Sequence, residues 1–318
     1  MKRPMKVLVI GAGALGQVFG LWLARGGASV TYLVRPGREG WEREGRTLFR
    51  LRRLGGPVAE RLRPAAVVAD LEDLNGEGGW DAVWLCVSST DLHGPWVQDL
   101  RDRVGSATVV PVIAAPHTLS DLTRIWPAEQ IVQVVPSVLA YQAPLTDEVP
   151  SPGIAYWMPP GAAITVSGAE DRAGDTVAAL RAGSVRARKA DREGAAEQNE
   201  ALMIPYMAAL EVADWSLPAL RKKLSAPTAA AREAAVVAAA LTDSEPPATA
   251  VPAWAIGLAM RALPVLAPFD LPRYLRAHWT KVGPQTREML DEWITEGRSR
   301  GQPVRRLEEL REALTARA

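Results

Sequence analysis

One stretch near the amino end constrains the fold more than any other part of this chain. Residues 6–10, with the sequence KVLVI, form a short, apolar, β-branched run that is typical of a buried parallel strand. Gly11, Gly13 and Gly16 follow at the spacing G-x-G-x-x-G, and the apolar residues after them recur with helical spacing. The order strand, glycine turn, helix predicts the first βαβ unit of a dinucleotide-binding sheet, whose second strand we expect at residues 29–34.

Each glycine has a physical role in such a turn. Gly11 permits the tight turn, Gly13 lets the backbone approach a pyrophosphate, and Gly16 allows the helix to pack closely on the strand. The helix then offers free N–H groups, including those of Ala14 and Leu15, and a partial positive charge to the phosphates. The alternative interpretation is a glycine-rich turn in a sheet protein that binds no nucleotide.

The residue at the end of the second strand indicates which cofactor such a site takes. An acidic residue there accepts the ribose 2′-hydroxyl of NAD, whereas an arginine suits the 2′-phosphate of NADP. This chain has Arg35 at that point and Arg38 three residues later, so the sequence predicts NADP, with Arg35 as the better candidate. The alternative is an arginine that is exposed to solvent and binds no phosphate.

The following segments continue the alternation of strands and helices. Buried strands are predicted at residues 81–87, 107–114 and 131–135, which favours a doubly wound parallel sheet. Ligands bind at the carboxyl ends of such strands, where this chain has Ser88, Ser89 and Ala115. Residues 39–63 are typical of an edge hairpin, and residues 151–189 indicate further strands near an edge together with one helix.

From residue 190 onward the pattern is almost entirely helical, with breaks at several prolines. We therefore expect an NADP-binding Rossmann domain at 1–189 and a helical domain for substrate binding and dimerisation at 190–318. A small substrate would meet the nicotinamide in the cleft between the two domains. The apolar stretch 252–266 could pack against a second copy, so we expect a homodimer.

Composition narrows the classes of partner. The net charge of +1 gives no argument for a nucleic acid or a membrane surface as partner, and no run of 18 apolar residues predicts a membrane span. Cys86 is the single cysteine, so an intrachain disulfide is impossible and a reducing cytoplasm is the simplest location. The three histidines have no spacing that is typical of a metal site, so we expect none.

At this point a family resemblance can be stated. The sequence GAGALGQ at residues 11–17, followed by LVRP at 33–36, resembles the cofactor signature of the ketopantoate reductase (2-dehydropantoate 2-reductase) family. The resemblance covers the chain in outline and implies a Rossmann domain joined to a helical domain of the 6-phosphogluconate dehydrogenase C-terminal type. It also implies NADPH-dependent reduction of a 2-oxo acid. An opine- or 6-phosphogluconate-type dehydrogenase shares this two-domain plan and is an alternative.

The catalytic residues of that family do not carry over to this chain. Where the family has a lysine early on the first helix of its second domain, this sequence has Ala196. Glu200 and Ile204 stand where the family has asparagines, although a shift of one residue would bring Asn199 near the first of them. Reduction of a ketone leaves negative charge on oxygen, so another residue must donate the proton, or the chain binds the nucleotide without hydride transfer.

Residues 274–287 contain the best candidates for that donor. On one continuous helix, His278, Lys281 and Gln285 would share a face, where they could hold a carboxylate and a carbonyl. We expect Lys281 to be the proton donor and His278 the second choice, with Asn199 and Glu200 as secondary candidates. The alternative is that these are packed or solvent-exposed residues without a catalytic role.

Overall fold

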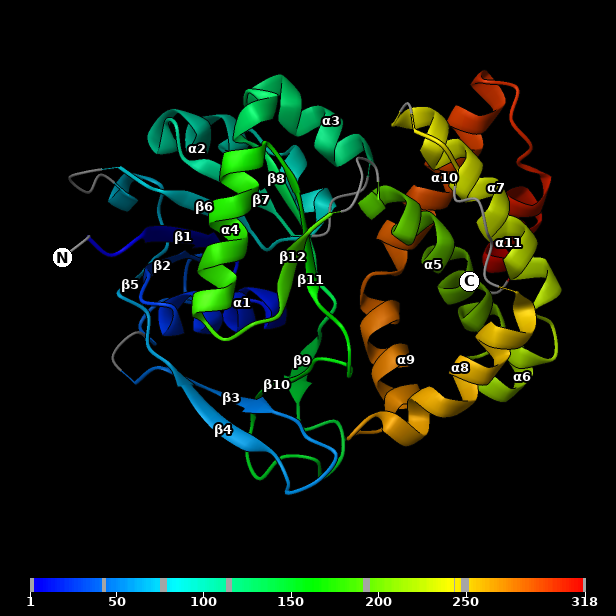
Figure 1. Cartoon of the computed structure of the whole chain (residues 1–318), viewed down its shortest axis with the longest axis horizontal. Coiled ribbons are helices and arrows are strands. Elements are labelled where there is room, and N and C mark those ends of the chain that lie inside the picture. The colour runs from blue at the N-terminus through cyan, green and yellow to red at the C-terminus, as the bar shows by residue number, and fades with distance from the viewer. Residues whose placement is uncertain are drawn as a thin grey trace. The chain divides into compact units, whose positions relative to one another are not determined.

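The computed structural model describes residues 3–41, 44–74, 79–112, 116–190, 195–242, 244–246 and 252–316. The chain divides into two compact units, Met1–Ala190 and Asp191–Ala318 (Figure 1). Every described strand lies in the first unit, and the described secondary structure of the second unit is helical. This confirms the expected α/β sheet followed by a helical region.

A parallel sheet forms the centre of the first unit, with the strand order β5-β2-β1-β6-β7. The strands are β1 (Lys6–Ile10), β2 (Ser29–Leu33), β5 (Ala66–Val68), β6 (Ala82–Leu85) and β7 (Thr108–Pro111). Its helices are α1 (Ala14–Arg25), α2 (Trp96–Val104), α3 (Pro116–Ile125) and α4 (Glu170–Ala182). Because β1 pairs in parallel with both β2 and β6, the carboxyl ends of these three strands lie at one edge.

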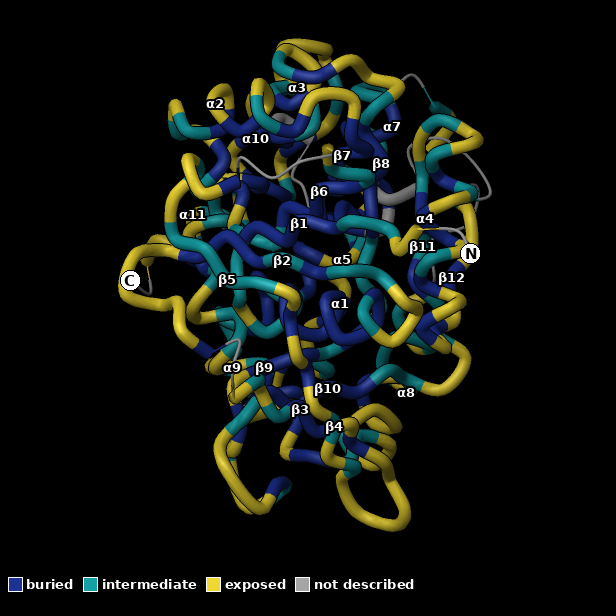
Figure 2. Tube along the Cα trace, turned by 90° about the vertical axis from the view of Figure 1, so that its left-hand side faces the viewer, coloured by how far each residue is buried: buried dark blue, intermediate teal, exposed yellow. Residues whose placement is uncertain are grey.

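The alternation of side chains along β1 builds two core layers. Val7 and Val9 pack on the face that α1 and α4 cover, while Leu8 and Ile10 pack on the face of α2 and α3. Figure 2 shows β6 in the colour of buried residues and β1 and β2 mostly in that colour. Burial on both faces explains why the strand sequence is an unbroken apolar run instead of an alternating one.

The strands after β7 extend this sheet and build another. β8 (Val132–Val135) bridges β7 in parallel and pairs antiparallel with β11 (Ile164–Gly168), which pairs with β12 (Ala187–Lys189). The expected edge hairpin is confirmed as β3 (Arg46–Arg50) and β4 (Val58–Leu62). It belongs to a separate sheet of order β4-β3-β10-β9, with β9 at Leu139–Ala143 and β10 at Gly153–Trp157. Short 3-10 helices span Glu72–Leu74, Ser89–His93 and Ala128–Gln130.

The second unit is built around α5 and α7. Its helices are α5 (Ala195–Val212), α6 (Leu217–Arg221), α7 (Ser225–Leu241), α8 (Ala253–Leu266), α9 (Leu271–Lys281), α10 (Gly283–Ser299) and α11 (Arg305–Thr315). α5 and α7 pack against each other, and both carry buried small side chains, among them Ala208, Ala231 and Ala234. Among the described residues no single helix has the length and apolar character to cross a bilayer; only α8 and α9 taken together, bent by 106°, pass that test.

The segment expected to carry the catalytic face is not one helix. α9 ends at Lys281 and α10 begins at Gly283, with Pro284 in its first turn. Proline has no N–H to continue the helix of the preceding residues, so the chain starts a new helix there. The expectation that Gln285 shares a helical face with His278 and Lys281 is therefore wrong.

Candidate functional site

Two glycines fix the turn that follows β1. Gly11 has φ +92°, in the left-handed region, and a Cβ there would lie 2.7 Å from Val87 Cγ1 and 2.9 Å from the Cys86 carbonyl oxygen. A Cβ on Gly16 would lie 2.1 Å from the Gly11 carbonyl oxygen. The end of β6, the turn and the start of α1 are therefore packed backbone to backbone, which only glycine permits.

Gly13, between these two, faces open space. It is the N-cap of α1 with φ −69° and ψ −176°, and a Cβ there would meet no described atom within 4 Å. The Gln17 N–H donates to the Gly13 carbonyl oxygen at 3.0 Å, and the Gln17 side-chain amide donates to the Ala12 carbonyl oxygen at 2.8 Å. The helix leaves its first-turn N–H groups without helical partners, namely those of Ala14, Leu15 and Gly16. An open backbone at a helix amino end is suited to a diphosphate.

Residues that follow β2 and β6 flank this turn. Arg35 comes two residues after β2, and Ser88 and Ser89 follow β6. Ser89 is 1% exposed, and its Oγ has no hydrogen-bond partner within the described part of the chain. A buried hydroxyl at the carboxyl edge of the sheet fits a site for a polar ligand. Ala115, the remaining candidate at this edge, lies outside the described residues.

An ion pair that the sequence analysis missed joins the two flanking segments. Arg35 Nη2 lies 3.1 Å from Asp91 Oδ1. Asp91 belongs to the 3-10 helix after β6, and the two residues are 56 positions apart in the chain. No sequence motif marks Asp91; only the parallel pairing of β2 and β6 with β1 brings the two segments to the same edge.

Cys86 has no features of a nucleophile. Burial raises the pKa of its thiol, so the thiol stays protonated at neutral pH. If Gly16 were replaced by a residue with a Cβ, that atom would lie 3.2 Å from the Cβ of Cys86. Cys86 therefore packs against the glycine turn.

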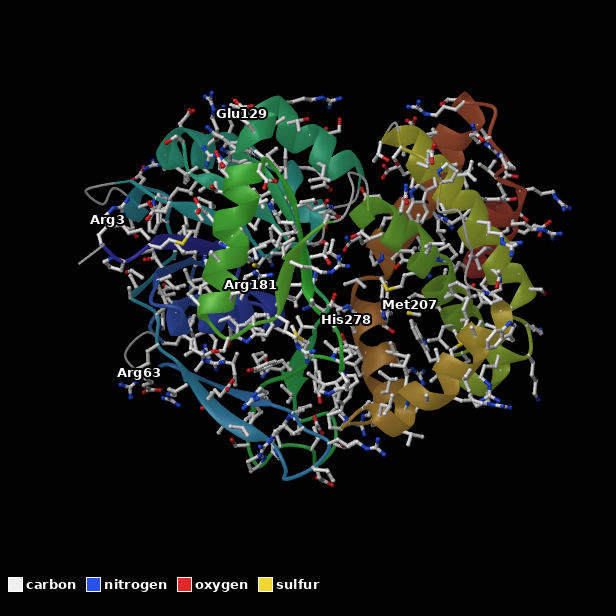
Figure 3. All side chains as sticks on the ribbon, in the orientation of Figure 1. Arg3, Arg63, Glu129, Arg181, Met207 and His278 are labelled. Atoms are coloured by element: carbon white, nitrogen blue, oxygen red, sulfur yellow. The ribbon has the colours of Figure 1, made fainter. Side chains whose placement is uncertain are left out.

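His278 and Lys281 lie at the end of α9 (Figure 3 labels His278). The His278 ring stacks on Tyr274 with 5.4 Å between ring centroids and meets Trp279 edge-on at 5.5 Å. Burial, together with the positive charge of Lys281, lowers the pKa of His278 to about 4. His278 is therefore neutral at pH 7 and can offer a hydrogen bond, while the exposed Lys281 carries the charge.

The residues aligned with the family's catalytic helix lie on α5. Glu200 is buried, whereas the side chain of Asn199 is outside the described part of the chain. Tyr206 is buried, and its hydroxyl forms a hydrogen bond of 2.9 Å with Thr228 Oγ1 on α7. Glu211 holds Arg287 at 2.5 Å, and this half-buried pair joins α5 to α10.

The comparisons with known proteins agree with this arrangement. Residues 7–143 match the family model of the ketopantoate reductase PanE/ApbA. A comparison with curated protein sequences finds no match. The family model describes reductases, so the match indicates an oxidoreductase of ketopantoate reductase type.

Several solved structures share the fold over nearly the whole chain. The 2-dehydropantoate 2-reductase from Methylococcus capsulatus has 20% identity and a TM-score of 0.71, covering 98% of this chain and 96% of its own. The enzyme of the same name from Geobacter metallireducens GS-15 has 17% identity and a TM-score of 0.69, covering 99% and 100%. D-mandelate dehydrogenase, solved with NADH and anilino(oxo)acetate, has 16% identity and a TM-score of 0.64, covering 98% and 97%.

At these identities the structural likeness shows the fold, and the sequence match adds a likeness to the family over residues 7–143. Residues 7–143 carry the strand, the glycine turn and the flanking strand ends described above. Residues 7–143 thus match the ketopantoate reductase PanE/ApbA family model, and nearly the whole chain has the fold of 2-dehydropantoate 2-reductases.

Proposed function

We propose that this chain is an NADPH-dependent reductase that acts on a 2-oxo acid or a related carbonyl or imine. The observation that carries the proposal is the open glycine turn at the start of α1, with an arginine at the end of the neighbouring strand. The first supplies N–H donors to a diphosphate, and the second supplies a guanidinium to a 2′-phosphate.

The residues proposed to hold the cofactor all belong to the carboxyl edge of the sheet. The first turn of α1 would bind the diphosphate, Arg35 the 2′-phosphate, and the segments after β6 and β7 the rest of the molecule. This last group contains Ser88, Ser89 and Ala115. NADPH supplies a hydride when bound, so this chain itself must stabilise the developing alkoxide and supply its proton.

Lys281 is the proposed proton donor. His278 is neutral at pH 7, because its pKa is lowered to about 4, so its proposed role is a hydrogen bond to the substrate. Asn199 and Glu200 remain secondary proposals for orienting the substrate. A second function, nucleotide binding without hydride transfer, is favoured by one observation: Ala196 stands where the resemblance implies a catalytic lysine.

A spectroscopic assay separates these two functions. Purified protein is mixed with NADPH and a panel of 2-oxo acids, aldehydes and imines, and the absorbance of NADPH is followed. We expect oxidation with at least one member of the panel and slow oxidation with ketopantoate, because Ala196 cannot donate a proton. Tight NADPH binding without oxidation by any member would favour the non-catalytic function. Calorimetry that shows no binding of NADPH or NADP would reject both.

Arg35→Asp tests the cofactor assignment. The change removes a guanidinium and places a carboxylate beside the 2′-phosphate, so we expect NADPH affinity to fall about 10²-fold. NADH lacks that phosphate, and its affinity should change less than about threefold. Titration of both reduced cofactors by fluorescence checks this result. Equal loss of both affinities would remove Arg35 from the 2′-phosphate site.

The proposal extends to a homodimer in the cytoplasm. Side chains on α8 are apolar and strongly exposed, including Trp254 at 73%, Leu258 at 60% and Val265 at 65%. An exposed apolar helix face of this kind is typical of an interaction surface, and a second copy is the occupant proposed here. Sedimentation velocity at micromolar concentration should show a dimer, and a monomer would contradict the proposal. The single cysteine supports a reducing compartment.

A further inference from the structure

Arg35 and Asp91 form a bridge over the edge where the cofactor is proposed to bind. Arg35 follows β2 and Asp91 follows β6, and these strands lie on either side of β1. The glycine turn continues from β1, between them. The guanidinium assigned above to the 2′-phosphate therefore already has an anionic partner within the protein.

Asp91 is held in place by its backbone. Its N–H donates to the Ser88 carbonyl oxygen at 3.0 Å, and its own carbonyl oxygen accepts from the Trp96 indole N–H at 3.0 Å. The side chain reaches Arg35 from this anchored backbone. In contrast the Arg35 side chain is 82% exposed, so it is free to exchange one anionic partner for another.

We propose that Asp91 sets how strongly this chain prefers NADPH over NADH. This inference rests on the proposed function, because it assumes that Arg35 faces the adenosine ribose. The 2′-phosphate must displace the Asp91 carboxylate from Arg35 and also tolerate its negative charge. A 2′-hydroxyl carries no charge and can leave the ion pair intact. Asp91 therefore lowers affinity for NADPH and leaves affinity for NADH nearly unchanged.

Asp91→Asn is the variant that tests this inference. Asparagine has the same shape and can still accept a hydrogen bond from Arg35, but it has no charge. We expect the dissociation constant of NADPH to fall about three- to tenfold and that of NADH to change less than about twofold. Added salt should shrink the gain, because the charges are exposed to solvent. Fluorescence titration with each reduced cofactor measures both constants, and thermal unfolding with each cofactor gives an independent readout.

Asp102→Asn is the matched control. Asp102 is also an exposed aspartate in an ion pair, 3.0 Å from Arg101 Nη1, so the change in net charge is the same. Asp102 lies near the carboxyl end of α2, just before the chain enters β7. It is therefore at the amino edge of the parallel sheet, opposite to the carboxyl edge where the cofactor is proposed to bind. We expect this variant to bind both cofactors as the wild type does.

The possible results distinguish a failure of the role of Asp91 from a failure of the proposed NADPH-dependent function. A wild-type chain that binds neither NADPH nor NADH would overturn both. If the wild type binds NADPH and Asp91→Asn leaves the ratio of the two dissociation constants unchanged, the role of Asp91 is wrong while the proposed function stands. An equal gain for both cofactors, or the same gain in Asp102→Asn, would likewise overturn the role of Asp91.

Discussion

Gly13→Asp is expected to weaken NADPH binding strongly while the protein stays at least as stable as the wild type. The Gly13 backbone has φ −69° and ψ −176°, which any residue can adopt, and no described atom would lie within 4 Å of an added Cβ. Aspartate is also a favoured N-cap, so α1 should gain a little stability. The same carboxylate would occupy and repel the proposed diphosphate site, and we expect a loss in affinity of about 10²-fold or more.

Two further glycine variants complete this experiment. Gly174→Asp adds the same charge on α4, where an added Cβ also meets no described atom. Two residues before it, Arg172 donates a hydrogen bond to Thr108 at the start of β7, so Gly174 lies at the sheet edge away from the glycine turn. We therefore expect NADPH binding to persist in this variant. Gly16→Ala should instead destabilise the fold, because its Cβ would lie 2.1 Å from the Gly11 carbonyl oxygen. Calorimetry and thermal unfolding report binding and stability separately. Wild-type affinity in Gly13→Asp would exclude the turn as the cofactor site.

The glycine turn could be predicted from sequence because the pattern that marks it is local. The strand, the turn and the helix are consecutive, and each glycine meets a constraint from residues within a few positions or from the adjacent strand. The alternation between the two core layers of β1 also follows from its position in a parallel sheet. The antiparallel hairpin of β3 and β4 could also be predicted from local sequence, but its pairing with β10 and β9 in a separate sheet could not.

The features that sequence analysis missed depend on distant parts of the chain. Asp91 meets Arg35, 56 positions away, because β2 and β6 both align with β1, and Asp91 belongs to no motif. Arg287 pairs with Glu211 on α5, which lies 76 positions earlier in the chain, and no sequence motif marks that contact. The dipeptide Gly283-Pro284 is a local signal for the break between α9 and α10. The helical spacing of His278, Lys281 and Gln285 nevertheless favoured one continuous helix. Periodicity gives the face of a helix only when the helix is continuous.

Lys281→Ala is expected to lower the turnover number about 10²- to 10³-fold on whichever carbonyl substrate the panel identifies. Ketone reduction leaves negative charge on oxygen, and loss of the group that protonates it removes general acid catalysis of that size. NADPH affinity should stay unchanged, because the proposed cofactor residues belong to the first unit while Lys281 ends α9 in the second. Steady-state kinetics with parallel NADPH titrations measure both quantities.

Two more lysine variants distinguish proton donation from charge alone. Lys281→Arg keeps the positive charge but cannot give up a proton, so we expect substrate binding to persist and turnover to stay low. Lys222→Ala removes another exposed lysine of the same unit, and its kinetics should equal those of the wild type. Full activity in Lys281→Arg would show that the charge orients the substrate and that another group donates the proton. Wild-type turnover in Lys281→Ala would remove Lys281 from the chemistry and would leave the proton to another group.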